Sequence, residues 1–281
     1  MATWRYVAHV KDTPTEVSEF VTPGEKTTYW DFGLESEQIV VEERLVGEEV
    51  TIFALTDGVH LEIVGHVFNY PRLGDGESGP PTRGMGQVCP APQIDDALLA
   101  HIRDEVLIPT VAEMAHRGHP LRGALFVDIM LVGGRPYVID YNVRFGDPAT
   151  QTILSAYQGD LYAALRACQT GEGLAEAVSA LHRDPRPRMS VVVACAGYPD
   201  KMVRGAPITL HQATFDADPD LWLFTDGVRV RGSAPETTGG RTYTVVAAGD
   251  TLAAARARAY AGVAAITFDG KHFRTDIGAG L

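Results

Sequence analysis

The middle of this 281-residue chain carries a strong β-hairpin signal. Two apolar runs, residues 125–132 and 136–142, flank a Gly-Gly pair, which indicates two antiparallel strands joined by a tight turn. Because side chains alternate between the two faces of a strand, Asp140 and Asn142 share one face. The hairpin therefore presents a carboxylate and an amide side by side.

The position of Asp128 on the facing strand depends on the length of the turn. A two-residue loop would set Asp128 opposite Ile139, whereas a three-residue loop, formed by the two glycines and the following arginine, sets it opposite Asp140. Opposed carboxylates repel, and a hard divalent cation between them removes the repulsion, with Asn142 as a neutral oxygen ligand. We therefore predict the three-residue loop and a site for Mg²⁺ bound to nucleotide phosphates. In the alternative interpretation, Asp128 points outward and Asp140 pairs with Arg144.

Composition excludes several classes of function. A net charge of −12 argues against a nucleic-acid surface, which needs a basic patch. It is compatible with ATP, whose charge is met locally by a metal and a few basic side chains. The cysteines show no CxxC spacing, so we expect them to stay reduced in the cytoplasm. We also expect no membrane span and no signal peptide, because the chain has neither a long apolar run nor an apolar leader.

Local patterns predict the other elements. Residues 4–10, 38–43, 50–54 and 60–68 read as strands, and so do 190–196, 222–225, 228–231 and 242–247. Helices are expected at 94–117, 148–156, 160–168 and 252–266. The first of these helices should be capped by Asp95 or Asp96 and kinked or split by Pro109.

The glycine- and proline-rich stretch 69–92 is too long for a simple connection, which predicts a functional loop. Its backbone N–H groups could form an anion nest, and the alternative is an Ω-loop on the surface. Residues 183–188, with two prolines, read as a linker.

Three stretches resemble one enzyme family. The hairpin and its continuation resemble the metal-binding strand of ATP-grasp ligases, and Arg-Phe-Gly-Asp-Pro at 144–148, with Gln151, resembles the phosphoribosylamine–glycine ligase family. Residues 74–86 are similar to the glycine-rich loop of that family, and residues 269–278 to its C-terminal signature. The likeness extends from about residue 40 to residue 278.

The resemblance implies an α+β fold of the ATP-grasp type, an antiparallel sheet with flanking helices followed by a small α+β C-terminal domain. The ATP-grasp region would span residues 1–185, with a truncated lid at 1–43 and the metal and nucleotide part at 44–185. The C-terminal domain would span 186–281. The N-terminal domain of the family is expected to be missing, so a partner chain could supply it.

The resemblance also assigns nucleotide-binding roles. Lys11, at the end of the strand 4–10, would reach the phosphates, and the alternative is a solvated lysine. The Glu42 side chain or nearby backbone would meet the adenine amine, the backbone N–H of Leu45 a ring nitrogen, and Glu49 the ribose hydroxyls. Without the resemblance, the acidic stretch after residue 41 would be a solvated turn.

The implied reaction is that of an ADP-forming C–N ligase. The γ-phosphoryl group of ATP moves to the carboxylate of an amino acid such as glycine, and an amine acceptor then attacks the acyl phosphate. Arg144 and Arg72 would steady the phosphoryl group or the carboxylate, and Asp147 would orient the amine or take its proton. The metal ligands, for Mg²⁺ or alternatively Mn²⁺, would be Asp128, Asp140 and Asn142.

Several positions depart from the family pattern. The lid region 13–17 has no glycine, and Asn69-Tyr70-Pro71 precede Arg72 where the family has Asp-His-Lys. Ala149 replaces a glutamate and Thr225 a histidine. Two alternatives therefore stay open: a nucleotide-binding subunit or impaired homologue that needs a partner chain, or a ligase with another amine acceptor.

Overall fold

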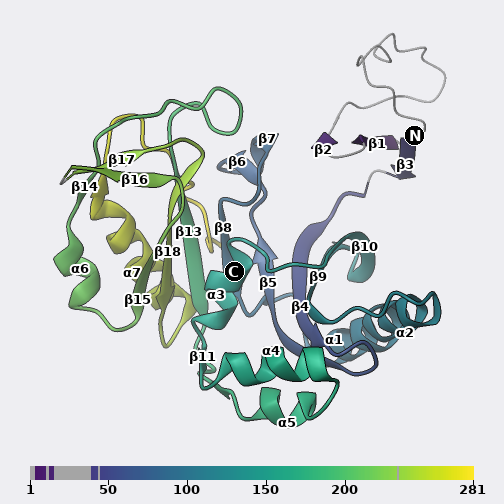
Figure 1. Cartoon of the computed structure of the whole chain (residues 1–281). Coiled ribbons are helices and arrows are strands. Elements are labelled where there is room, and N and C mark those ends of the chain that lie inside the picture. The colour runs from purple at the N-terminus through teal and green to yellow at the C-terminus, as the bar shows by residue number, and fades with distance from the viewer. Residues whose placement is uncertain (1–3, 11–12, 16–38, 44, 233) are drawn as a thin grey trace, which may run out of the picture. The chain divides into compact units, whose positions relative to one another are not determined.

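The computed structural model describes residues 4–10, 13–15, 39–43, 45–232 and 234–281, which belong to two compact units divided between Gly47 and Glu48 (Figure 1). The first unit contains a three-stranded antiparallel sheet in the order β2-β1-β3. Its strands are β1 (Trp4–Val10), β2 (Thr13–Thr15) and β3 (Ile39–Glu43). The strands predicted at 4–10 and 38–43 are confirmed, whereas Lys11 lies outside the described residues.

The second unit is built on an eight-stranded antiparallel sheet in the order β10-β9-β4-β5-β8-β13-β18-β15. The sheet contains strands from both sides of the predicted boundary at residue 185. Its strands are β4 (Glu48–Thr56), β5 (Leu61–Asn69), β8 (Gly86–Cys89), β9 (Gly123–Val132), β10 (Arg135–Asn142), β13 (Arg188–Ala194), β15 (Leu221–Thr225) and β18 (Arg241–Ala248).

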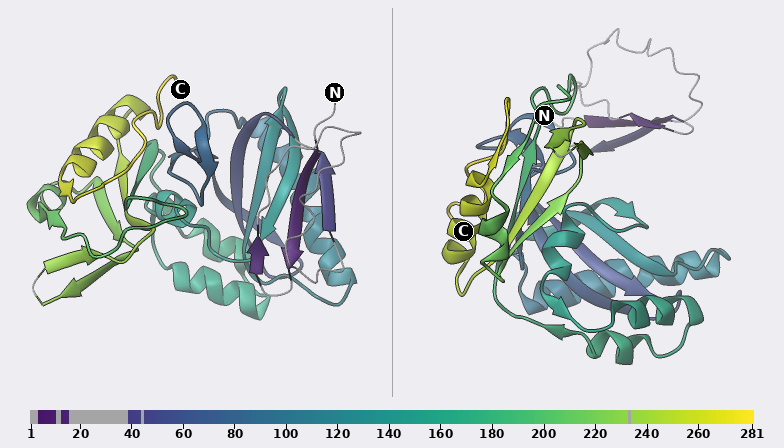
Figure 2. Two further views of the ribbon diagram at one scale, coloured as in Figure 1. Left: turned by 90° about the horizontal axis from the view of Figure 1, so that it is seen from above. Right: turned by 60° about the vertical axis from the view of Figure 1, so that its left-hand side comes forward.

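The helices pack on the faces of this sheet (Figures 1 and 2). They are α1 (Asp96–Ile102), a π-helical segment (Arg103–Leu107), α2 (Ile108–His116), α3 (Ala149–Leu154), α4 (Leu161–Thr170), α5 (Leu174–Ser179), α6 (Gln212–Asp216) and α7 (Leu252–Ala264). Asp95 caps α1 by accepting a 2.7 Å hydrogen bond from the backbone N–H of Leu98. The long helix is not split at Pro109: α1, the π-helical segment and α2 follow one another without a gap, with right-handed helical backbone at Arg103 and Ile108. The irregularity is the π-helical segment, which ends at Leu107, two residues before Pro109.

The hydrophobic core consists of separate clusters on the two faces of the large sheet. Ile102, Leu107 and Val111 of the first helices pack on one face of β4 and β9, against residues such as Ile52 and Val127. Helices α3, α4 and α5 pack on the opposite face, against Phe53, Leu55 and Phe126. Helix α7 covers β13 and β18 (Figure 2), and its small residues allow this close approach: a Cβ on Gly262 would lie 2.8 Å from Val245.

The stretch 69–92 is more ordered than predicted. It contains the β6–β7 hairpin, formed by Arg72–Gly74 and Ser78–Pro81, and then β8, a strand of the large sheet. Strand β8 was not predicted from the sequence because it begins with a glycine, which disfavours strands. Gly86 is required there, because a Cβ would lie 2.5 Å from the Ser190 carbonyl oxygen.

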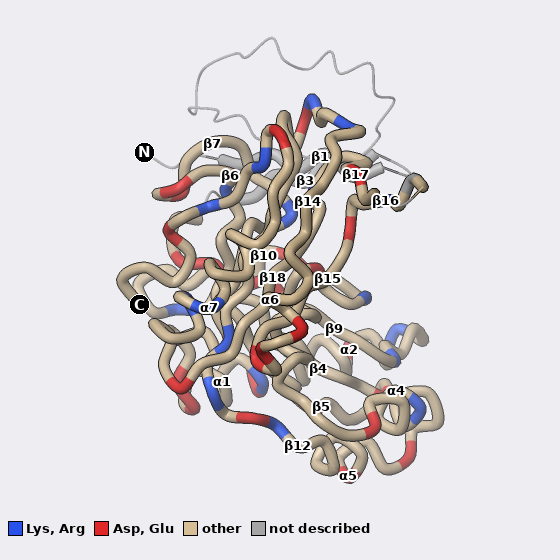
Figure 3. Tube along the Cα trace, turned by 90° about the vertical axis from the view of Figure 1, so that its left-hand side faces the viewer, with Lys and Arg blue, Asp and Glu red and all other residues tan. Residues whose placement is uncertain are grey.

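Short strand pairs complete the unit: β11 (Tyr157–Gln158) with β12 (His182–Arg183), β14 (Thr209–Leu210) with β19 (Ile266–Thr267), and β16 (Val228–Arg231) with β17 (Ala234–Thr237). Acidic and basic residues are interspersed along the described trace (Figure 3). They pair with near neighbours, as Arg117 does with Glu113, and also across long sequence separations, as Arg274 does with Glu77. In the predicted linker, Arg186 lies 2.7 Å from Asp184 and 2.8 Å from Asp220, so this segment is pinned to the domain. Within the described part of the chain, no helix is both long and apolar enough to cross a bilayer.

Candidate functional site

The hairpin of β9 and β10 positions the predicted metal ligands by a different route from the one expected. Arg135 pairs with Val132, so the loop holds only two glycines, both with positive φ, and the three-residue prediction is wrong. A β-bulge at Ile139 then shifts the register by one residue, so that Asp140 lies opposite Asp128. The predicted pairing of the two aspartates is therefore confirmed.

The three side chains converge. The Asn142 amide nitrogen lies 3.1 Å from Asp128 Oδ2 and 3.2 Å from Asp140 Oδ2, and donates to both. Two carboxylate oxygens thus converge on one NH₂ group. A cation would require the same convergence, with the amide turned to present its oxygen. The alternative ion pair is not formed among the described residues: Asp140 accepts from Asn142 and from its neighbour's backbone N–H, rather than from Arg144.

The candidate site offers few protein ligands for a permanently bound metal ion. Within the described residues no three His, Cys, Asp or Glu side chains gather as a metal site, and this site has two carboxylates and an amide. A cation held here would complete its shell with water and phosphate oxygens, as Mg²⁺ does with nucleotides.

The electrostatics of Asp128 also suit a cation. Burial raises the pKa of this carboxyl group, the charge of Asp140 raises it further, and the Thr51 hydroxyl, Arg144 and Asn142 oppose the shift. A bound divalent cation would reverse the net effect, because it favours the ionised form.

The segment after β10 is anchored on an aromatic pair. Phe53 and Phe126 stack with ring centroids 4.3 Å apart, and the Phe145 ring meets the edge of Phe53 at 5.8 Å. Gly146 lies against the Phe126 ring, where an added Cβ would come within 2.9 Å. Arg144 is exposed, and its guanidinium donates to the Phe145 carbonyl at 3.1 Å. The motif thus places an arginine in solvent beside the paired aspartates.

Asp147 is held by an arginine that the sequence reasoning missed. Arg241, at the start of β18, is only 6% exposed, and its Nη2 lies 2.6 Å from Asp147 Oδ2. Its Nη1 also donates to the carbonyl oxygens of Asp147 and Arg83, at 3.0 and 3.2 Å. Gln151 donates to the other carboxylate oxygen of Asp147 at 2.9 Å. No local signal distinguished Arg241, because its partners lie far away in the sequence.

The glycine-rich loop and the C-terminal signature clasp each other. Arg274, which is 1% exposed, lies 2.6 Å from both Glu77 and Asp276, and its guanidinium stacks over the Tyr70 ring. The backbone N–H of Gly76 donates to Asp276 at 2.8 Å. This N–H of the predicted anion nest is therefore already used by a protein carboxylate.

The remaining predicted residues are placed separately. Arg72 donates to the Gly79 carbonyl at 3.2 Å, across the β6–β7 hairpin. Glu42 lies on β3, and Leu45 is half-buried in the first unit. Glu49 lies on β4 in the second unit, where it accepts a 3.1 Å hydrogen bond from Asn69.

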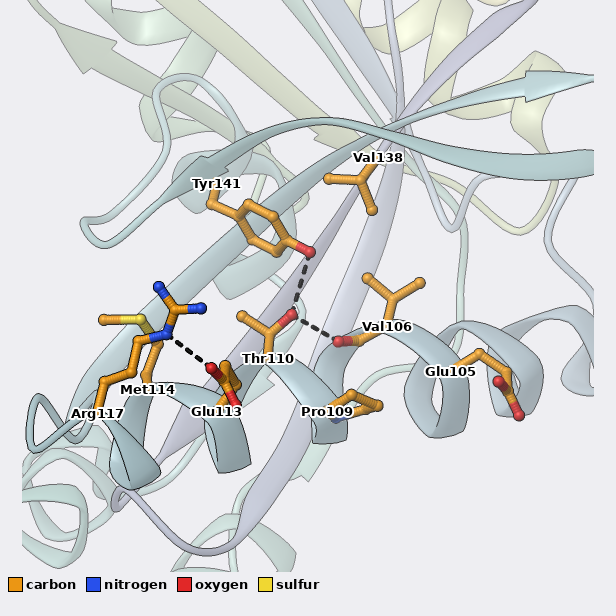
Figure 4. Close-up of a pocket in the computed structure, with 9 residues that line it drawn as sticks. All are labelled: Glu105, Val106, Pro109, Thr110, Glu113, Met114, Arg117, Val138 and Tyr141. Atoms are coloured by element: carbon orange, nitrogen blue, oxygen red, sulfur yellow. Dashed lines mark hydrogen bonds and ion pairs between the residues drawn. The ribbon is translucent and has the colours of Figure 1, made fainter.

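A cavity of about 390 Å³ lies on the other face of β10 (Figure 4). Tyr141, which points away from Asp140 and Asn142 by strand alternation, reaches across it to Thr110 of α2, with 3.0 Å between the hydroxyl oxygens. The cavity is therefore separate from the paired aspartates, and this contact supports the hairpin from behind.

Comparison with known proteins identifies the family. The profile named "Phosphoribosylglycinamide synthetase, ATP-grasp (A) domain" matches residues 15–150, and "Phosphoribosylglycinamide synthetase, C domain" matches residues 188–280. The chain belongs to this family. The resemblance to this family that the sequence showed, and the ATP-grasp fold that it implied, are thereby confirmed.

Individual relatives agree. Phosphoribosylamine–glycine ligase of Rhodopirellula baltica is 36% identical over 88% of this chain and 56% of its own length, and that of Streptomyces coelicolor is 39% identical over 86% and 58%. The chain thus spans a little over half the length of these relatives.

Solved structures extend the comparison. The crystal structure of the Thermotoga maritima phosphoribosylamine–glycine ligase matches with a TM-score of 0.73 and 32% identity, over 85% of this chain and 57% of that one. The biotin carboxylase domain of Hydrogenobacter thermophilus 2-oxoglutarate carboxylase, in complex with MgADP, shares the fold with a TM-score of 0.61 at 10% identity, over 86% of this chain and 50% of that one.

Proposed function

We propose that this chain is an ATP-dependent ligase that joins glycine to phosphoribosylamine, the reaction for which its relatives are named. The observation that carries the proposal is the convergence of Asp128 and Asp140 on the Asn142 amide, in a member of the family. In the first step the carboxylate of the amino acid attacks the γ-phosphorus of ATP, which gives an acyl phosphate and ADP. The amine then attacks the acyl carbon and expels phosphate, forming the amide.

The residues divide this work by position. Asp128, Asp140 and Asn142 would hold Mg²⁺, which neutralises charge on the phosphates when it is bound. The exposed guanidinium of Arg144 is available to the transferring phosphoryl group or to the carboxylate. Positioning and charge neutralisation account for most of the catalysis in such transfers.

Asp147 would orient the amine. Its carboxylate accepts from Arg241 and from Gln151, and a carboxylate has about four lone-pair sites, so it can also accept an N–H of the attacking neutral amine. The Arg241 contact fixes the carboxylate, which suits an orienting role.

The proposed nucleotide contacts are the phosphates for Lys11, the adenine amine for Glu42, a ring nitrogen for Leu45 and the ribose hydroxyls for Glu49. Among these residues, Glu49 lies on β4, the strand that also carries Thr51, which donates to Asp128. We also infer a reducing compartment such as the cytoplasm, because all three cysteines are free and buried.

The proposal is tested with Asp140→Asn, which keeps the volume of the side chain and removes one charge from the metal site. We expect the affinity for Mg²⁺–ATP to fall about tenfold or more, because loss of a ligand should cost at least as much as loss of its supporting contacts. Asp250→Asn, at an exposed carboxylate before α7, is the matched control and should bind as the wild type does.

Two measurements are needed. Calorimetry gives the affinity for Mg²⁺–ATP, and phosphate release with glycine and freshly generated phosphoribosylamine gives the ligase rate. Equal affinity in Asp140→Asn and in the control would refute the metal site. Release that requires a different amine would refute phosphoribosylamine as acceptor while retaining the ligase chemistry, which matters because Tyr70, Pro71 and Ala149 depart from the family pattern.

A further inference from the structure

A row of polar side chains crosses the large sheet at the level of the paired aspartates. It runs from Asp128 on β9 through Thr51 on β4 and Asn69 on β5 to Gln87 on β8, four strands that are consecutive neighbours in the sheet. Thr152 of α3 donates toward Gln87 from above, at 3.1 Å. The row is therefore continuous from the candidate metal site to the interior beneath α3.

The hydrogen bonds of the row all point the same way. The Gln87 amide donates to Asn69 Oδ1 at 2.8 Å, the Asn69 amide donates to Thr51 Oγ1 at 2.7 Å, and the Thr51 hydroxyl donates to Asp128 Oδ1. A hydroxyl has a single proton, so the N–H that Asn69 supplies leaves the proton of Thr51 for Asp128. Hydrogen bonds aligned in this way polarise one another.

Water does not replace these contacts. Thr51 is 4% exposed, Gln87 5% and Asn69 9%, and buried polar groups need partners within the protein. The members of the row therefore supply hydrogen-bond partners to one another inside the protein.

Asn69 also connects the row to a second carboxylate. Its amide nitrogen lies 3.1 Å from Glu49 Oε1 as well as 2.7 Å from Thr51 Oγ1. The two hydrogens of one NH₂ group thus serve Glu49 and, through Thr51, Asp128. An aspartate at this position would carry no hydrogen for Glu49 or Thr51, and it would place a third carboxylate between Glu49 and Asp128.

We propose that Asn69 is a positioning residue that holds the ribose-side carboxylate Glu49 and, through Thr51, the metal-side carboxylate Asp128 in one fixed arrangement. This inference rests on the proposed nucleotide and metal roles of those two carboxylates.

Binding measurements on the full chain test this positioning role without requiring turnover. Thr51→Val removes the hydroxyl that donates to Asp128, and Thr51→Ser, the matched control, retains it. Thr51→Val should weaken Mn²⁺ binding about tenfold, as expected for a lost hydrogen bond to a charged group, and should leave metal-free ADP binding unchanged. Thr51→Ser should bind both as the wild type does.

Asn69→Asp should weaken metal-free ADP binding, because Glu49 loses the N–H that Asn69 donates. It should also weaken Mn²⁺ binding, because the Thr51 hydroxyl can then donate to the new carboxylate instead of to Asp128. Electron paramagnetic resonance gives the Mn²⁺ affinity, and calorimetry in a chelator gives the ADP affinity. Equal Mn²⁺ affinities in Thr51→Val and Thr51→Ser, or unchanged ADP binding in Asn69→Asp, would overturn the inference. A wild type that binds Mn²⁺ and ADP but forms no amide would count against the ligase alone, whereas a wild type that binds no Mn²⁺ would overturn both.

Discussion

The buried Arg241 should be one of the most sensitive positions in the larger unit. One guanidinium joins the Asp147 carboxylate, the Asp147 carbonyl and the Arg83 carbonyl, which belong to segments far apart in the sequence. Arg241→Met keeps much of the volume of the side chain and removes all three donors. The segment 144–148 should then lose its connection to β18.

The expected loss in the free energy of unfolding depends on how exposed the groups that Arg241 contacts are. Breaking a fully buried ion pair costs about 3–5 kcal/mol, but the Asp147 side chain is 42% exposed and can be hydrated, so its share should be about 1 kcal/mol. Each carbonyl that loses its donor adds about 1 kcal/mol. The free energy of unfolding should therefore fall by about 3 kcal/mol, or about 6–12 °C in Tm for a domain of this size.

Arg229→Met is the matched control. Arg229 pairs with Glu236 at 2.6 Å, the same distance as the Arg241–Asp147 pair, but the Arg229 side chain is 60% exposed. An exposed pair contributes about 0–1 kcal/mol, so this variant should unfold within about 4 °C of the wild type. Thermal unfolding followed by calorimetry compares the two, and equal shifts in Tm would refute the argument from burial.

Two further predictions concern other parts of the fold. Burial, together with the charge of Arg183, lowers the pKa of His66 to about 4 from its usual 6.5. As the pH falls from 6.5 to 4, His66 therefore binds a proton in the unfolded chain but stays neutral in the native state. The free energy of unfolding should fall by about 3 kcal/mol over this range. Urea unfolding against pH should show this loss in the wild type and a shallower one in His66→Asn, and parallel curves would contradict it. Deletion of Ile139 removes the bulge and should leave Asp140 opposite Asp128, with Mg²⁺–ATP affinity in calorimetry within about threefold of the wild type; a loss beyond tenfold would show that the bulge itself is required.

Local signals in the sequence predicted the elements whose stabilising contacts are also local. Asp95, one of the two caps predicted for α1, accepts a 2.7 Å hydrogen bond from the backbone N–H of Leu98. Strands with apolar alternation, such as β1 and β5, lie where they were predicted.

The contacts that the sequence did not reveal join distant segments. Arg241 and Arg83 are 158 positions apart, and Thr152 and Gln87 are 65 apart, so no window along the chain contains both partners. A buried arginine or glutamine also looks like any surface residue until its partners are known, because its type alone favours exposure. The polar row and the Arg241 contacts therefore required the structure.

In the β9–β10 hairpin the predicted loop length was wrong, yet the predicted pairing of Asp128 with Asp140 was right. The position of Asp128 is set by the ladder between β9 and β4, where it lies opposite Thr51, and that ladder lies inside the sheet. Strand β10 lies at the edge, so an extra residue there disturbs hydrogen bonds on one side only. With a two-residue turn and no bulge, Asp128 would pair with Ile139. Ile139 instead forms the bulge on β10, which moves Asp140 opposite Asp128. The interior ladder fixes one aspartate, and the edge strand adjusts to bring the other opposite to it.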